Sequence, residues 1–407
     1  VRDEEGNVLP CTVLERRREP IFLLPDDGFR QVHEAERIRA AVRVSMPPFA
    51  TRRLTLCEGA EPPSPLRAGP DFLENEFVRL QFHANGSFDL LAEGAPVLRD
   101  QNTFEEVGDG GNEYEFKGNG KTFDTLSDRA KLKVSRLTSE RAVMEVENHL
   151  RTQDGGEMCI RSEVTLKRGS RLAEISVSFR NTCKNHRVCA CFGGAVGEVL
   201  AESPFDLIRR PFPGARWKRP ENPQRTGGAV MLLSGEGGGV WAGRGLNAYE
   251  ALPEGKLRLV LLRGVGEMGD WFTFPTEDSQ GLGERHAEYA VTAFGPSERD
   301  EAVRRARNFC RPPLFAAVTG PHAGQNFAPG LSLQADGLVL TSCLKRAEDQ
   351  KGWILRLFNP GEGETSLTFS LPGRETDLKE EACKEPSCRF TLGPKKIMTF
   401  RLDRLGR

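Results

Sequence analysis

One glycine-rich segment gathers more groups capable of binding a sugar than any other part of this sequence. It runs from Asp109 to Phe116 and holds three acids, the amide of Asn112 and Tyr114, one of only three tyrosines in the chain. Carboxylate and amide oxygens accept hydrogen bonds from hydroxyl groups, and an aromatic ring can cover the apolar face of a sugar. The alternative is a polar hairpin in which Tyr114 fills the core. Either way, the segment is predicted to join two strands.

Arg263 is the second residue with a clear chemical requirement, because it lies inside the apolar run Leu261–Val265. A buried guanidinium must be paired with a carboxylate or with several carbonyl oxygens. We therefore expect Arg263 to be structural and to have such partners.

The sequence contains no self-contained catalytic motif. It has no G-x-S-x-G elbow, phosphate-binding glycine loop or H-E-x-x-H pair, and its six histidines are dispersed. The ten cysteines are too sparse for a disulfide scaffold and favour reduced thiols in a cytoplasmic protein. The closest three, Cys183, Cys189 and Cys191, lack paired C-x-x-C spacing, so buried strand thiols are favoured over a zinc site and no metal ligands are expected in this chain.

The elements that must position these residues are strands. Val78, Leu80 and Phe82 alternate with polar residues, as do the apolar residues of 173–179, and each pattern puts apolar side chains on one face of a strand. The same pattern predicts five further strands, at Leu132–Leu137, Ile160–Leu166, Leu257–Leu262, Leu367–Leu371 and Ile397–Leu402.

Turn and helix signals divide the strands. Asn85-Gly86 and Asp336-Gly337 each predict a type I′ hairpin. Ser297 and Asp300 predict a capping box at the start of one helix, which follows helical spacing to Cys310 and stops at Pro312-Pro313.

Three domains are therefore expected in an all-β chain: a small β-sandwich over 1–60, a large β domain over 70–296, and a helix with a C-terminal β-sandwich over 297–407. The net charge is −1, which gives no indication of a nucleic-acid partner, and no apolar run is long enough for a membrane helix.

The ordered set of polar motifs resembles the C-terminal half of family 38 glycoside hydrolases, in particular bacterial α-mannosidases and mannosylglycerate hydrolases. The segment from Asp109 to Tyr114 is similar to the D-x-G-D-x-Y loop of that family, except that Asn112 stands where an aspartate is expected. Further segments match in the same order: Asn75-Glu76-Phe77, His186-Arg187, Ser203-Pro204-Phe205, Arg210-Pro211, Arg244-Gly245-Leu246, Tyr249-Glu250, Leu261-Leu262-Arg263, Leu344–Asp349 and Leu355–Pro360.

The resemblance implies a galactose-mutarotase-like supersandwich flanked by smaller immunoglobulin-like β-sandwich domains. It also implies retaining hydrolysis of α-mannosides by a zinc-bearing N-terminal catalytic domain, which this chain does not contain. The chain would then bind no catalytic zinc, would be inactive alone, and would have that catalytic domain and an α-mannoside or related sugar as partners. Tyr114 is the best match to a tyrosine that family members place near the bound mannose, and Asn112 and Asp109 would accompany it.

Two other functions fit the expected fold. A free-standing carbohydrate-binding module requires an exposed aromatic platform, for which the candidates are Trp217, Trp241, Trp271 and Trp353. An aldose mutarotase or epimerase requires a paired histidine and carboxylate in the sandwich cleft, where His83 or His149 would have to serve.

Overall fold

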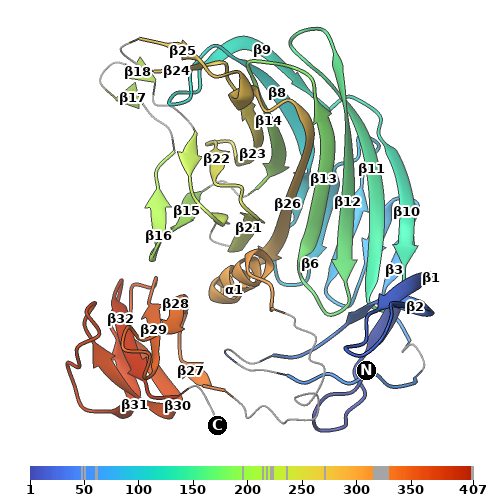
Figure 1. The fold of residues 1–407 in the computed structure, drawn as a ribbon. Coiled ribbons are helices and arrows are strands. Elements are labelled where there is room, and N and C mark those ends of the chain that lie inside the picture. The colour runs from blue at the N-terminus through green and yellow to red at the C-terminus, as the bar shows by residue number, and fades with distance from the viewer. Residues whose placement is uncertain are drawn as a thin grey trace.

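The computed structural model describes residues 1–46, 49, 52–59, 63–194, 197–212, 215–216, 219–220, 224–234, 237–269, 272–314 and 330–404. These residues form strands almost throughout, with one α-helix and one 3-10 turn, which confirms the predicted all-β class (Figure 1). No described helix has the length and apolar character that a membrane crossing would need.

Two large antiparallel sheets face each other and form a β-sandwich (Figure 1). In spatial order, the nine-stranded sheet contains β10 (Lys131–Leu137), β11 (Arg141–Arg151), β12 (Glu157–Lys167), β13 (Ala173–Asn181), β26 (Gly283–Phe294), β21 (Gly237–Gly243), β20 (Val230–Ser234), β15 (Glu198–Ser203) and β16 (Asp206–Arg210). The six-stranded sheet contains β19 (Arg225–Thr226), β22 (Ala248–Ala251), β23 (Lys256–Gly264), β14 (His186–Gly193), β8 (Thr103–Asp109) and β9 (Gly118–Asp124).

A five-stranded sheet shares the core of this sandwich. Its strands are β3 (Arg67–Gly69), β4 (Phe72–Glu74), β5 (Val78–Phe82), β6 (Phe88–Ala92) and β7 (Leu98–Gln101). Leu80 of β5, Phe104 of β8 and Val177 of β13 are fully buried in one hydrophobic cluster, so the three sheets are stabilised together by apolar burial.

The C-terminal domain is a separate six-stranded β structure with its own core around Phe400. Its strands are β27 (Leu333–Ala335), β28 (Leu340–Arg346), β29 (Trp353–Phe358), β30 (Thr365–Thr376), β31 (Ser387–Leu392) and β32 (Ile397–Leu402). Helix α1 (Arg299–Cys310) lies between this domain and the sandwich (Figure 1). It buries Ala302, Val303 and Ala306 against apolar residues of both.

The N-terminal strands stand apart from these cores. β1 (Cys11–Leu23) and β2 (Gln31–Val42) pair only with each other in the described chain, and most of their residues are exposed. Among the described residues of 1–60, this hairpin is the sheet that the structure shows. The sandwich predicted for that range, and the other two predicted domain ranges, therefore stay predictions.

Two short strand pairs complete the set. They are β17 (Ala215–Arg216) with β18 (Arg219–Pro220), and β24 (Glu267–Met268) with β25 (Phe274–Pro275). The 3-10 turn η1 spans Glu277–Gln280.

All of the strands predicted from alternation are present, but the turn and cap predictions need correction. Asn85-Gly86 does close the β5–β6 hairpin, yet Gly86 alone of the two has positive φ, so the turn is not type I′. Asp336-Gly337 closes no hairpin, because β27 pairs with β30 rather than with β28. The helix has Glu298 as its N-cap and no side-chain cap hydrogen bond, so the predicted capping box is wrong.

Candidate functional site

The glycine-rich segment joins β8 to β9 at one end of the sandwich and is held from below by Arg263 of β23. Arg263 Nε lies 2.7 Å from Asp109 Oδ2, and the side chain of Asp109 is fully buried. The guanidinium also donates to the carbonyl oxygens of Asn112 (2.5 Å), Glu113 (3.2 Å) and Glu115 (2.7 Å). Arg263 thus has both kinds of partner that its burial requires, a carboxylate and a set of carbonyls.

Asp109 also organises the loop backbone. Its Oδ1 accepts hydrogen bonds from the amides of Gly111 (2.8 Å) and Lys117 (3.0 Å). Both carboxylate oxygens are therefore occupied by the protein, and Asp109 supports the loop from beneath.

A second brace comes from the segment between β23 and β26. Asn112 Nδ2 donates to the Gly269 carbonyl (3.2 Å), and the Thr276 hydroxyl donates to Glu113 Oε1 (2.7 Å). Asn112 Oδ1 accepts the amides of Tyr114 and Glu115, which turns the loop locally. Asn112 is thus used mainly in holding the loop.

Tyr114 is an exposed side chain of this loop, with 67% of its surface accessible to solvent. The ring that packs inward is instead Phe116, whose centroid lies 3.6 Å from the guanidinium carbon of Arg187. Tyr114 as a core plug is therefore contradicted. The structure brings Asp109, Asn112 and Tyr114 onto one braced loop, on which Tyr114 is exposed while Asp109 and Asn112 hold the backbone.

Buried charges beneath the loop are paired. Arg187 lies 2.5 Å from Glu250, and Arg258 bridges Glu250 (3.1 Å) and Glu105 (2.6 Å). Burial would raise the pKa of Glu105, but its hydrogen bonds and charge contacts with Arg258 and Lys256 outweigh burial and lower it. This network fixes the strands that carry the loop.

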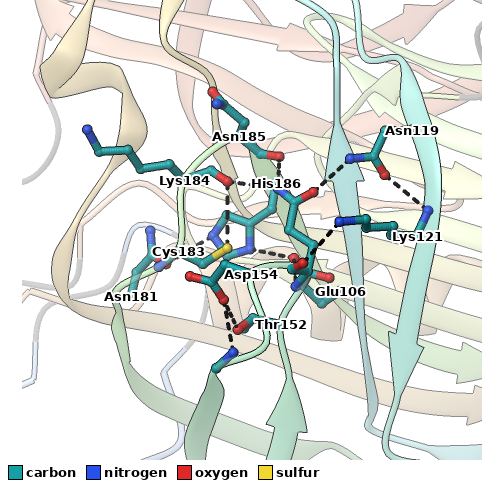
Figure 2. A network of polar contacts seen from close by, with 12 residues as sticks. Glu106, Asn119, Lys121, Thr152, Asp154, Asn181, Cys183, Lys184, Asn185 and His186 are labelled. Atoms are coloured by element: carbon teal, nitrogen blue, oxygen red, sulfur yellow. Dashed lines mark hydrogen bonds and ion pairs between the residues drawn. The ribbon is translucent and has the colours of Figure 1, made fainter.

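A different buried cluster joins β8 to the turn between β13 and β14 (Figure 2). Glu106, Cys183 and His186 each offer a ligand-type atom, and these atoms all lie within 4.8 Å of one another. Burial, and then the Asp154 and Glu106 carboxylates, raise the pKa of the Cys183 thiol to about 11. Cysteine spacing missed this grouping because Glu106 is far away in sequence and Cys189 and Cys191 lie in a separate apolar cluster with Val260.

The two described tryptophans do not form the exposed aromatic platform that a carbohydrate-binding module requires. Trp241 is fully buried and donates to Gln101 Oε1 (3.0 Å), and Arg346 covers the Trp353 ring at 4.3 Å. Trp217 and Trp271 lie outside the described residues.

The two histidines considered for mutarotase chemistry do have carboxylate neighbours, which spacing did not indicate. His83 Nε2 lies 3.0 Å from Asp89, and His149 Nδ1 lies 2.8 Å from Glu157. Both side chains are roughly two-fifths exposed, and so neither has the enclosed setting that would tune a general acid or base.

Comparisons with known proteins give one family model and one curated relative. Residues 338–400 match the C-terminal beta sandwich domain of family 38 glycosyl hydrolases. The chain is 29% identical over 384 residues to a Halalkalibacterium halodurans protein provisionally named a mannosylglycerate hydrolase, and the alignment covers 81% of this chain and 41% of that protein.

Solved structures show the same fold over almost the whole chain. An α-mannosidase from Enterococcus faecalis V583 superposes with a TM-score of 0.88 at 24% identity, covering 98% of this chain and 50% of that one. A glycosyl hydrolase family 38 protein from Enterococcus faecalis gives 0.84 at 22% identity, covering 98% and 52%. The chain thus spans about half the length of the proteins it matches.

Proposed function

Because this chain belongs to the C-terminal β region of family 38 glycoside hydrolases, we propose that it supports and walls the sugar site of a retaining α-mannosidase-type enzyme. The chemistry would reside in a catalytic half of the same enzyme, where two carboxylates carry out retaining hydrolysis and a zinc ion is expected to hold sugar hydroxyls. The β half described here would be inactive alone.

The observation that carries this proposal is the exposed Tyr114 on a loop that the protein holds rigidly. Arg263, Asp109 and Asn112 make at least seven hydrogen bonds to or within the loop, so Tyr114 is presented without a large ordering cost on binding. A tyrosine can stack on a sugar ring and hydrogen-bond a hydroxyl with its phenol. Asp109 and Asn112 would act by positioning Tyr114.

The N-terminal hairpin supports the need for a second half. Its strands are 13 and 12 residues long and carry exposed Ile21, Phe22, Val32 and Ile38. A two-stranded sheet is only marginally stable by itself in water, and a partner would shield these four apolar side chains from solvent. Since the matched relatives are about twice as long as this chain, we assign that surface to the catalytic half.

The test compares the full gene product with the 407-residue chain, using an aryl α-mannoside. We expect hydrolysis only by the full product, and expect Tyr114→Phe to lower kcat/KM about tenfold, as the loss of one hydrogen bond to a sugar hydroxyl would.

Tyr249→Phe is the matched control, because it removes the same hydroxyl from a side chain only 1% exposed. Hydrolysis by the 407-residue chain alone would contradict the proposal that the catalytic groups lie in the other half of the enzyme. Equal kinetics for wild type, Tyr114→Phe and Tyr114→Ala would remove Tyr114 from the sugar site.

A further inference from the structure

The cluster of Glu106, Cys183 and His186 has a donor set that suits a transition metal. It contains one sulfur, one imidazole nitrogen and carboxylate oxygens, all from residues at most 1% exposed. Thiolate, imidazole and carboxylate together favour Zn²⁺ over Mg²⁺ or Ca²⁺, which prefer oxygen ligands alone.

The hydrogen bonds around His186 determine which ring nitrogen is available. Asn181 Nδ2 donates to the carbonyls of Gln280 (3.2 Å) and Gly281 (3.0 Å), which fixes its Oδ1 as the acceptor. His186 Nε2 lies 2.9 Å from that oxygen and must therefore carry the proton. His186 Nδ1, 3.0 Å from Glu106 Oε1, is the nitrogen left for a ligand.

Asn181 also resembles the outer support of a metal site. Zinc-binding histidines usually donate their second N–H to a carbonyl or carboxylate, which orients the ring. Here the same Asn181 Oδ1 also accepts the Cys183 amide at 3.1 Å. One anchored side chain thus orients the two residues that would supply sulfur and nitrogen.

One carboxylate oxygen in this cluster has no hydrogen-bond partner among the described residues. It is Oε2 of Glu106, whose side chain is fully buried. Leaving a carboxylate oxygen buried without a partner costs several kcal/mol in a low-dielectric interior. A cation beside Glu106 would remove that cost.

We propose that Glu106, Cys183 and His186 form a structural Zn²⁺ site. On binding, the ion displaces the thiol proton of Cys183 and the proton shared between His186 Nδ1 and Glu106, and both are released to solvent. A thiolate, a neutral imidazole and a carboxylate carry a charge of −2, so the loaded site is neutral, as a fully buried site requires.

The ion would fasten the corner where the chain passes from the nine-stranded sheet to the six-stranded sheet. The Cys183 thiol donates to the Lys184 carbonyl at 3.6 Å. Asp154, on the β11–β12 turn, lies beside it, and its carboxylate is the nearest candidate for a fourth ligand (Figure 2). The adjacent Asn185 carbonyl accepts the Asp109 amide at 2.8 Å, so the site lies directly below the loop of Tyr114.

The experiment measures metal content and the cobalt spectrum of the 407-residue chain. We expect about one zinc per chain after refolding with Zn²⁺ and dialysis, and a thiolate-to-cobalt charge-transfer band after refolding with Co²⁺. Cys183→Ser should abolish the band, and Asp154→Asn should weaken metal binding less than Cys183→Ser does.

Two control variants make the test specific. Cys189→Ala changes an equally buried thiol outside the cluster, and it should keep the band. Cys159→Ser changes the other described group containing a thiol, Glu147, His149 and Cys159, and should keep it too. No zinc retained by folded wild type, or a cobalt band that survives Cys183→Ser or follows Cys159, would overturn the proposal.

Discussion

Two buried carboxylates three residues apart on β8 are treated in opposite ways by this protein. Asp109 has both oxygens occupied, by Arg263 and by two backbone amides. Glu106 is paired on one oxygen with His186 and has its other oxygen unpartnered within the described chain. Asp109 is fully paired within the protein and supports the Tyr114 loop, whereas Glu106 would have both oxygens paired only when an ion is bound.

Arg263→Ala should produce the largest change, because it leaves the Asp109 carboxylate and three carbonyls without their partner. Breaking a buried ion pair from one side costs about 3 to 5 kcal/mol. We expect that decrease in the free energy of unfolding from urea denaturation. Arg180→Ala, in an exposed pair with Glu284, is the control and should lower the free energy of unfolding by less than about 1 kcal/mol. Equal losses for the two variants would mean that the Arg263–Asp109 pair stabilises the protein no more than an exposed ion pair does.

Zinc should stabilise the wild type and have no effect on Glu106→Gln. At about 100 times the dissociation constant, a ligand specific to the native state adds about 2.7 kcal/mol. Thermal unfolding with Zn²⁺ and with a chelator measures the difference. A zinc-induced rise in melting temperature of the same size in Glu106→Gln would mean that zinc does not bind through Glu106, and that Glu106, like Asp109, needs no ion.

Glu105 gives a pH test of a third carboxylate on the same strand, which is paired like Asp109. Its folded-state pKa is below the ordinary 4.5, so its stabilisation is present above pH 4.5 and is lost as the pH falls through the folded pKa. Glu105→Gln should cost about 2 kcal/mol at pH 7, the value of hydrogen bonds to charged groups. This loss of unfolding free energy should become smaller below pH 4.5, where Glu105 is increasingly protonated in the wild type. A loss that does not change with pH would contradict the ion pairing of Glu105 with Arg258 and Lys256.

Tyr114→Ala should have the smallest effect on stability. Its side chain is 67% exposed, and surface substitutions of this kind change stability by less than about 0.5 kcal/mol. Urea denaturation of the 407-residue chain measures this. A loss above about 1 kcal/mol would mean that Tyr114 belongs to the scaffold with Asp109.

The regular strands could be predicted because burial of one face imposes period-2 alternation, as in β5 and β13. Arg263 was predictable too, since a charge within an apolar run demands specific partners. Turn types were less predictable: Asp336-Gly337 has hairpin composition, but β27 pairs with β30, a strand some 30 residues further along.

The site was only partly predictable for the same reason. Loop residues 109–116 are contiguous and could be read as one unit. The Glu106, Cys183 and His186 cluster depends on β8 pairing with β14, with Gly108 opposite His186. Nothing in cysteine or histidine spacing encodes that long-range register.

The most direct test of the proposed role is the activity of the full gene product with Tyr114 intact or changed to Phe. We expect α-mannoside hydrolysis whose kcat/KM falls about tenfold in Tyr114→Phe while the unfolding free energy of the β half stays unchanged. An enzyme with the same kcat/KM for both forms would contradict the claim that this loop walls the sugar site.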